Sequence, residues 1–157
     1  MAAVIAAGLG LLLCQETVSP KFYLNASPSV QRGMYVVSSQ TPYGRGSLVV
    51  AALPPGAASL AARRGYLASG IPVLKRVSGL TGDRVCRDGL LIRVNGRMVA
   101  AAKVADARGR SLPVWNGCLL LHDDDVFLLG DRSDSFDGRY FGPLKRTQII
   151  GKATRIW

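Results

Sequence analysis

Short runs rich in Val and Leu, each bounded by Gly, Pro or Ser, recur through this 157-residue chain and limit its fold more than any other feature. Such runs are typical of β-strands, and the turn residues between them interrupt helical periodicity. We therefore predict a mainly β fold. The expected strands cover residues 34–39, 47–53, 71–78, 90–94, 97–101, 126–129 and 149–156.

Two turns in this pattern place individual elements. Asn95-Gly96 tolerates positive φ at both central positions of a two-residue turn, so it predicts a hairpin between the runs on either side. Pro54-Pro55-Gly56 precedes residues 57–68, the one segment that suits a helix. We expect one short helix among the strands, with no repeat and no linker that divides the chain.

Residues 1–15 carry no charged side chain, and most of them form one unbroken apolar run. This run is shorter than the roughly 20 residues of a membrane-spanning helix, and it lacks the basic start of a secretory signal. We expect a hydrophobic anchor over residues 1–15, unusually short or beginning upstream of Met1, and one domain over residues 16–157. A buried helix is the alternative, whereas lipidation of Cys14 is disfavoured because a bulky leucine precedes it.

Lys and Arg outnumber Asp and Glu by 20 to 10, which gives a net charge of +10. Residues 17–82 contain seven basic and no acidic side chains, whereas residues 83–137 hold nine of the ten acids. A basic half suits an anionic neighbour, and membrane lipid fits an anchored domain; a solvated basic face is the alternative. Nucleic acid is not expected, because aromatic residues do not alternate with the basic ones as a stacking surface requires.

The few His and Cys residues exclude several kinds of site. His122 is the only histidine, and the three cysteines contain no Cys-x-x-Cys pair. A His-rich metal site is therefore excluded, and the cysteine pattern argues against a zinc ribbon and thioredoxin chemistry. An imidazole-based hydrolase would have to use His122, but the acidic run 123–125 that follows it is better interpreted as a solvated turn.

One lysine stands inside an apolar strand pattern. If the strand alternates, Lys75 shares a face with Val73 and Val77, where an ammonium group is costly. Burial lowers the pKa of a lysine and allows it to act as a general base near neutral pH. The alternative is that Lys75 extends from a strand edge to solvent.

Two polar segments complete the candidate chemistry. Ser27-Pro28-Ser29 alone is an ordinary turn signal. Residues 130–143 form a loop rich in Asp, Ser and Arg, whose acid spacing departs from that of a calcium loop and which lacks the terminal bidentate Glu.

Taken in order, these three segments resemble the signal peptidase I superfamily of Ser/Lys-dependent membrane peptidases, and within it the TraF-type conjugative-transfer peptidases. The resemblance covers the chain from its apolar start to Pro143. It implies a signal-peptidase-like β-fold catalytic domain that needs no metal or nucleotide cofactor. The matching residues are Ser27-Pro28-Ser29 with Gly33-x-Tyr35, Lys75-Arg76-Val77 with Gly79 and Gly82-Asp83, and Gly130-Asp131 with Ser135-Phe136-Asp137-Gly138-Arg139-Tyr140-Phe141-Gly142-Pro143.

By this resemblance Ser29 is the nucleophile and Lys75 the general base, a recognised substitute for the Ser-His-Asp triad. The neutral amine takes the hydroxyl proton, returns it to the leaving amine, and then activates the water that hydrolyses the acyl-enzyme. The Ser29 backbone N–H and the Ser27 hydroxyl form the oxyanion hole, unless Ser27 only caps the turn.

The resemblance also assigns supporting roles to the last motif. Ser135 orients the lysine amine, and Asp137 with Arg139 forms an ion pair whose role is either functional or structural. Two positions depart from the family pattern. Gln31 stands where the TraF type usually has a proline, and Gly138 stands where serine is common.

The family implies a catalytic domain in the periplasm, attached to the inner (cytoplasmic) membrane. This oxidising compartment permits a disulfide between Cys86 and Cys118, which encloses about 30 residues and stabilises the fold by on the order of 3 kcal/mol in the chain-entropy model. Two buried free thiols are the alternative.

The leading hypothesis is a membrane-anchored serine endopeptidase that processes a translocated precursor protein. For the TraF type, the resemblance further implies conjugative pilin maturation linked to cyclisation. A general signal peptidase I that removes leader peptides is one alternative, and a non-enzymatic basic β-domain that binds membrane or nucleic acid is another. Self-cleaving repressors share Ser-Lys chemistry, but an apolar N-terminal run does not fit their DNA-binding module.

Overall fold

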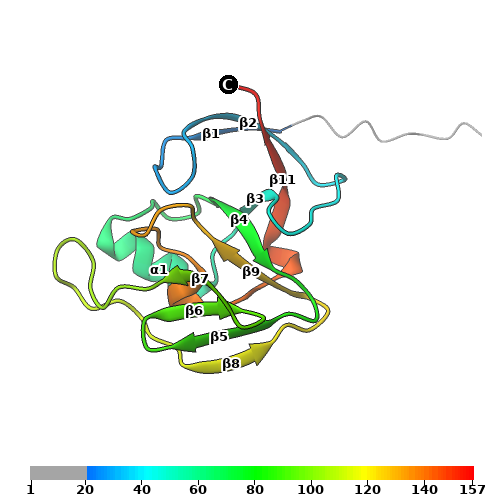
Figure 1. The fold of residues 1–157 in the computed structure, drawn as a ribbon. Coiled ribbons are helices and arrows are strands. Elements are labelled where there is room, and N and C mark those ends of the chain that lie inside the picture. Colours follow the sequence, from blue (N-terminus) through cyan, green and yellow to red (C-terminus); the bar gives the residue numbers. More distant parts are fainter. Residues whose placement is uncertain (1–20) are drawn as a thin grey trace, which may run out of the picture.

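A computed structural model describes residues 21–157, which form two antiparallel β-sheets and one ten-residue helix (Figure 1). The expected anchor over residues 1–15, including Cys14, lies outside the described residues. The elements are β1 (Lys21–Asn25), β2 (Gly33–Ser38), β3 (Leu48–Ala51), α1 (Pro55–Arg64), β4 (Val73–Gly79), β5 (Arg84–Asp88), β6 (Leu91–Val94), β7 (Arg97–Ala101), β8 (Gly117–Leu120), β9 (Asp125–Leu129), α2 (Gly138–Phe141), β10 (Leu144–Lys145), the 3-10 turn η1 (Arg146–Gln148) and β11 (Ile149–Arg155).

The larger sheet has seven strands in the order β1-β2-β11-β3-β4-β9-β10. The last strand, β11, lies between β2 and β3, so the end of the chain joins the β1–β2 hairpin to the rest of the sheet (Figure 1). β4 lies between β3 and β9, with Lys75 opposite Val49 and Arg76 opposite Leu129. The strand that carries the candidate base is therefore paired on both sides, and its backbone is fixed by two neighbours.

The smaller sheet has four strands in the order β7-β6-β5-β8. The predicted hairpin is confirmed, with φ values of 50° at Asn95 and 80° at Gly96 between β6 and β7. Cys86 on β5 lies opposite Cys118 on β8, and a disulfide of 2.06 Å joins their sulfur atoms. The expected disulfide is thus present, and the free-thiol alternative is wrong.

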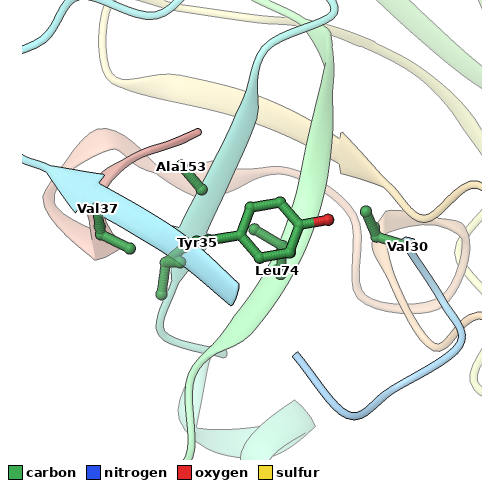
Figure 2. Close-up of a cluster of buried hydrophobic side chains, with 6 residues drawn as sticks. Val30, Tyr35, Val37, Leu74 and Ala153 are labelled. Carbon is green, nitrogen blue, oxygen red and sulfur yellow. The ribbon is translucent and has the colours of Figure 1, made fainter. Parts of the chain in front are cut away.

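One hydrophobic cluster packs directly beneath the candidate site. Tyr35 on β2 is fully buried, and Figure 2 shows its ring over Leu74 with its hydroxyl directed toward Val30. The hydroxyl donates to the carbonyl of Gln31 at 2.6 Å. Val30 follows Ser29 and Leu74 precedes Lys75, so one cluster holds both segments in place. Its buried members are Val30, Tyr35, Val37, Val50, Leu74 and Ala153.

The mainly β prediction is confirmed, and all seven expected strands are present with ends shifted by at most a few residues. The helix begins at Pro55 and ends at Arg64, four residues earlier than expected, because Gly65 adopts φ 70° and its N–H donates to the carbonyl of Ala62. This left-handed residue is a common helix terminator. The structure also contains β1, β5, β8, β10 and the single turns α2 and η1, which were not predicted from the sequence.

Among residues 21–157, no helix is both long and apolar enough to cross a membrane.

Candidate active site

The turn that carries Ser27 and Ser29 is organised by Asn25, the last residue of β1. Asn25 is 3% exposed, and its Oδ1 accepts a hydrogen bond of 3.2 Å from the Ser27 N–H. Its Nδ2 donates to the carbonyls of Ser27, Val30 and Gln31 at 3.0–3.1 Å. One buried amide therefore closes the turn and leaves the serine hydroxyls toward solvent. Asn25 was not among the site residues expected from the sequence, although an Asn two residues before a Ser is a known turn signal.

The two serines of this turn contact each other. Their Oγ atoms are 3.1 Å apart, and the Ser29 N–H donates to Ser27 Oγ at 3.3 Å. The Ser29 carbonyl accepts a 2.7 Å hydrogen bond from the Asp131 N–H, which fastens the turn to the segment after β9. The N–H of Ser29 is thus bonded within its own turn, and its carbonyl is bonded to the segment after β9.

Lys75 is buried, with 3% of its surface exposed, and its Nζ donates to Ser135 Oγ at 2.7 Å. The alternative in which Lys75 extends to solvent is therefore wrong. Burial lowers the pKa of Lys75 to about 8, and Asp137 partly opposes this shift while Arg139 adds to it. An amine with a pKa of about 8 is neutral in about one molecule in ten at pH 7, compared with fewer than about one in a thousand at the ordinary pKa of 10.5.

Asp137 and Arg139 form a buried ion pair beside Lys75. The Arg139 Nη2 lies 3.1 Å from Asp137 Oδ2, and the two side chains are 3% and 0% exposed, respectively. Asp137 also accepts hydrogen bonds from the N–H groups of Gly130 (2.7 Å) and Arg139 (3.1 Å). Burial raises the pKa of Asp137, and Arg139 and these donors oppose the rise. Because every partner donates, the contacts suit an ionised carboxylate.

Two glycines of the last motif have no room for a side chain. A Cβ on Gly130 would collide with Ser135 Oγ and would lie 3.0 Å from the Ser29 carbonyl oxygen. A Cβ on Gly138 would lie 2.7 Å from the Leu128 carbonyl oxygen. The departure from the family pattern at Gly138 thus has a local cause, because α2 packs closely against β9.

Besides Lys75, the second motif contains two charged residues, Arg76 and Asp83, whose hydrogen bonds fix neighbouring segments. Arg76 forms two hydrogen bonds of 2.9 Å with the carboxylate of Asp131, whose N–H binds Ser29. Asp83 accepts hydrogen bonds from the Leu80 N–H and the Asn95 amide. The Arg76 pair joins the strand of the lysine to the segment that holds the nucleophile turn.

A cavity of about 590 Å³ opens between the larger sheet, α1 and the chain after β7. Ser27, Ser29, Lys75 and Ser135 all line it, so the structure brings these sequence-derived candidates together. No direct hydrogen bond joins Ser29 and Lys75 among the described residues. The rest of the wall is largely apolar and includes Leu53, Ala61, Leu67, Val73, Leu112, Tyr66, Phe136 and Tyr140.

His122 is not part of this cavity. It is exposed in the turn between β8 and β9, where its backbone N–H donates to Asp125. The geometry offers no support for a triad built on His122. Within residues 21–157, no three His, Cys, Asp or Glu side chains are grouped so as to hold a metal ion.

Comparison with known proteins shows the family to which this chain is similar. The family model for signal peptidase, peptidase S26, matches residues 1–157. A plasmid transfer protein TraF from Escherichia coli is 37% identical over 157 residues, which cover 93% of this chain and 88% of the relative. A probable conjugal transfer protein TraF from Sinorhizobium fredii is 33% identical over 86% of this chain and 76% of its own length.

Two signal peptidases match less of the chain or match it less closely. A signal peptidase I from Bacillus caldolyticus is 35% identical over 54% of this chain and 53% of the relative. The crystal structure of a signal peptidase I from Enterococcus faecalis is 23% identical, with a TM-score of 0.43, and covers 74% of this chain and 100% of that one. The family resemblance seen in the motifs is confirmed by the full-length family match and by the TraF relatives. The chain belongs to the signal peptidase family, peptidase S26, a family of serine peptidases that act on proteins.

Proposed function

We propose that this chain is a membrane-anchored serine endopeptidase in which Ser29 is the nucleophile and Lys75 the general base. The observation that carries the proposal is one cavity lined by both side chains, in which Lys75 is buried and has a pKa of about 8. A hydroxyl is a weak nucleophile until a base removes its proton, and a neutral buried amine can do so.

In the proposed reaction, the Lys75 amine takes the proton of Ser29 as Oγ attacks the scissile carbonyl carbon. The resulting ammonium group then donates this proton to the leaving amine as the peptide bond breaks. Ser135 keeps the amine in place through the 2.7 Å hydrogen bond. The acyl-enzyme is released when the same amine deprotonates a second nucleophile that attacks the ester.

The oxyanion hole is proposed to consist of the Ser29 N–H and the Ser27 hydroxyl. In the structure the Ser29 N–H donates to Ser27 Oγ at 3.3 Å, a long hydrogen bond that a substrate oxygen can replace. The Ser27 hydroxyl would then donate to the same oxygen. Loss of one such donor typically costs about 3–4 kcal/mol of transition-state stabilisation.

The proposed substrate is a translocated precursor, and the relatives named as plasmid and conjugal transfer proteins favour a conjugative pilin. The largely apolar cavity wall suits an extended apolar segment next to the cleaved bond. Water as the second nucleophile gives a linear product. The amino terminus of the same chain gives a cyclic one, which is lighter by one water.

We propose that the domain lies against the inner membrane on its periplasmic side. Phe22 and Leu24 on β1 are exposed, as are Ile156 and Trp157, the two residues that follow β11, and β1 comes shortly after the apolar run of residues 1–15 in the sequence. Exposed apolar side chains next to such a run suit contact with membrane lipid. The disulfide between Cys86 and Cys118 agrees with an oxidising compartment.

The experiment is the processing of a candidate pilin precursor in membranes that contain the wild type, Ser29→Ala, Lys75→Ala or His122→Ala, with product masses measured by mass spectrometry. Loss of processing in the first two variants alone supports the dyad, and a product lighter by one water supports cyclisation. Processing in all three variants would contradict the proposal and favour a non-enzymatic basic domain. Cleavage restricted to leader peptides would favour a general signal peptidase.

A further inference from the structure

Arg87 on β5 is a buried cation to which the proposed reaction gives no role. It is 2% exposed, and its Nη1 donates to the Arg139 carbonyl at 2.5 Å and to the Pro113 carbonyl at 3.3 Å. Its Nε donates to the Gly89 carbonyl at 3.0 Å. Among the described residues no carboxylate pairs with it, and burial lowers its pKa. Burying a guanidinium whose partners are all carbonyls costs free energy, so the question is what its contacts hold in place.

The shortest of these hydrogen bonds, to the Arg139 carbonyl, joins Arg87 to the candidate site. Arg139 accepts from Arg87 through its carbonyl, while its own guanidinium donates to the Gly130 and Arg132 carbonyls at 2.9 and 2.8 Å and pairs with Asp137. Asp137 in turn accepts from the Gly130 N–H. Arg87 therefore connects the smaller sheet to Arg139, one partner of the ion pair beside Lys75.

The backbone on either side of Arg87 is fixed by strand pairing and by the neighbouring disulfide. Cys86, the residue before Arg87, is joined by the disulfide to Cys118 on β8. A second contact reaches the same helix, because Trp115 Nε1 donates to the Gly138 carbonyl at 3.0 Å. Arg87 and Trp115, which both lie between Cys86 and Cys118 in the sequence, thus hold α2 through its Arg139 and Gly138 carbonyls.

We propose that Arg87 is a positioning residue, which fixes α2 so that Asp137 and Arg139 keep water away from the Lys75 amine and hold their charges in place beside it. The proposal rests on the proposed function of Lys75. The charged groups that act on this amine are Asp137, Arg139, Asp131 and Asp134, all in the segment between β9 and α2 or in the first turn of α2. Arg87 acts on Lys75 only through this segment.

Release of α2 would admit water to the amine, and lower burial would raise the pKa of Lys75 from about 8 toward its ordinary value of 10.5. We expect Arg87→Met and Arg87→Lys to shift the titration midpoint of Lys75 to higher pH by about one unit, which is about tenfold less neutral amine at neutral pH. The lysine variant keeps the charge but lacks the planar fork of donors.

The test is the titration of the Lys75 side-chain carbon next to Nζ, followed by NMR in the full chain in detergent micelles. In parallel, the pH dependence of cleavage is measured with a quenched peptide that spans the precursor's cleavage site. Arg84→Met is the matched control, because Arg84 lies on the same strand with an exposed side chain. Circular dichroism identifies variants that do not fold. If both Arg87 variants unfold, Trp115→Phe provides the test that α2 is held from this side, because it removes the hydrogen bond to the Gly138 carbonyl and keeps an aromatic ring next to Phe127; an unchanged Lys75 midpoint in this variant overturns the proposal.

An alkaline shift in the Arg87 variants, absent in Arg84→Met, supports the proposal. A folded Arg87 variant with an unchanged Lys75 midpoint overturns it, even if its activity is lower, because the loss would then be structural only. Cleavage that survives Lys75→Ala overturns the proposed function instead. The NMR midpoint still reports on Arg87 in that case, so the two failures can be distinguished.

Discussion

Lys75 Nζ and Ser135 Oγ form a buried hydrogen bond of 2.7 Å, although the two residues are 60 positions apart in the chain. The serine hydroxyl is an acceptor that directs the amine into the cavity. We expect Ser135→Ala to lower kcat by about 10- to 100-fold, since a hydrogen bond to a charged or reactive group is worth about 1.5–3 kcal/mol. Ser133→Ala, an exposed serine of the same loop, is the control and should retain full activity in the peptide cleavage assay.

The burial of Lys75 also predicts how stability depends on pH. The pKa is about 8 in the folded chain and 10.5 ordinarily, so between these values only the unfolded chain holds the proton. Stability should therefore rise as the pH increases from about 8 to about 10.5, by on the order of 3 kcal/mol in total. Below about pH 8 the buried ammonium destabilises the fold.

Lys75→Met should accordingly unfold at a higher temperature than the wild type at about pH 6, and the difference should shrink as the pH passes from about 8 to 10. Thermal unfolding of both proteins across this pH range measures the effect. A constant difference at all pH values would mean that Lys75 titrates in the folded protein as it does in the unfolded chain.

Gly130 and Gly56 offer a matched pair of glycine substitutions. Gly130→Ala would force Ser135 or the Ser29 turn to move, so we expect a loss of about 1–3 kcal/mol in stability and a large loss of activity. Gly56→Ala lies in α1 with open space around it and should raise stability by up to about 1 kcal/mol. Stability is measured by denaturant unfolding and activity by peptide cleavage. If Gly130→Ala changes neither, Gly130 is not closely packed against Ser135 and the Ser29 turn.

The disulfide predicts a dependence of stability on redox conditions. Cys86 and Cys118 are 32 positions apart, for which the chain-entropy model gives about 3–4 kcal/mol. Reductant should lower the unfolding temperature of the wild type, and the Cys86→Ala, Cys118→Ala double variant should be insensitive to it. Equal unfolding temperatures with and without reductant in the wild type would show that the disulfide adds no stability.

The candidate site residues could be named from the sequence, because the three segments that carry them resemble the motifs of a known family. Lys75 interrupts an alternating apolar strand, and Ser29 lies in a Ser-Pro-Ser turn. Their relative placement could not be predicted, since it depends on side chains from other segments. Asn25 and Tyr35 hold the serine turn through contacts that only the folded chain creates.

The strands that sequence reasoning missed have unusual side-chain patterns. β1 directs Phe22 and Leu24 outward and buries Asn25, the reverse of the usual arrangement. β5 places Arg87 on its buried face, where alternation predicts an apolar residue. In β1 and β5 a tertiary contact overrides the local pattern, and both strands support the proposed site.

The disulfide closes a segment that contributes one side of the cavity. Leu112 and residues 103 and 105–107 line the cavity, and all of them lie between Cys86 and Cys118. Because the segment is tied at its base, we expect residues 103–112, which include neither Arg87 nor Trp115, to tolerate changes in sequence without displacing the Ser29 turn or the strand that carries Lys75. Substitutions in this stretch would reshape one wall of the cavity, and with it the peptide segment that fits there, while Ser29 and Lys75 stay in place.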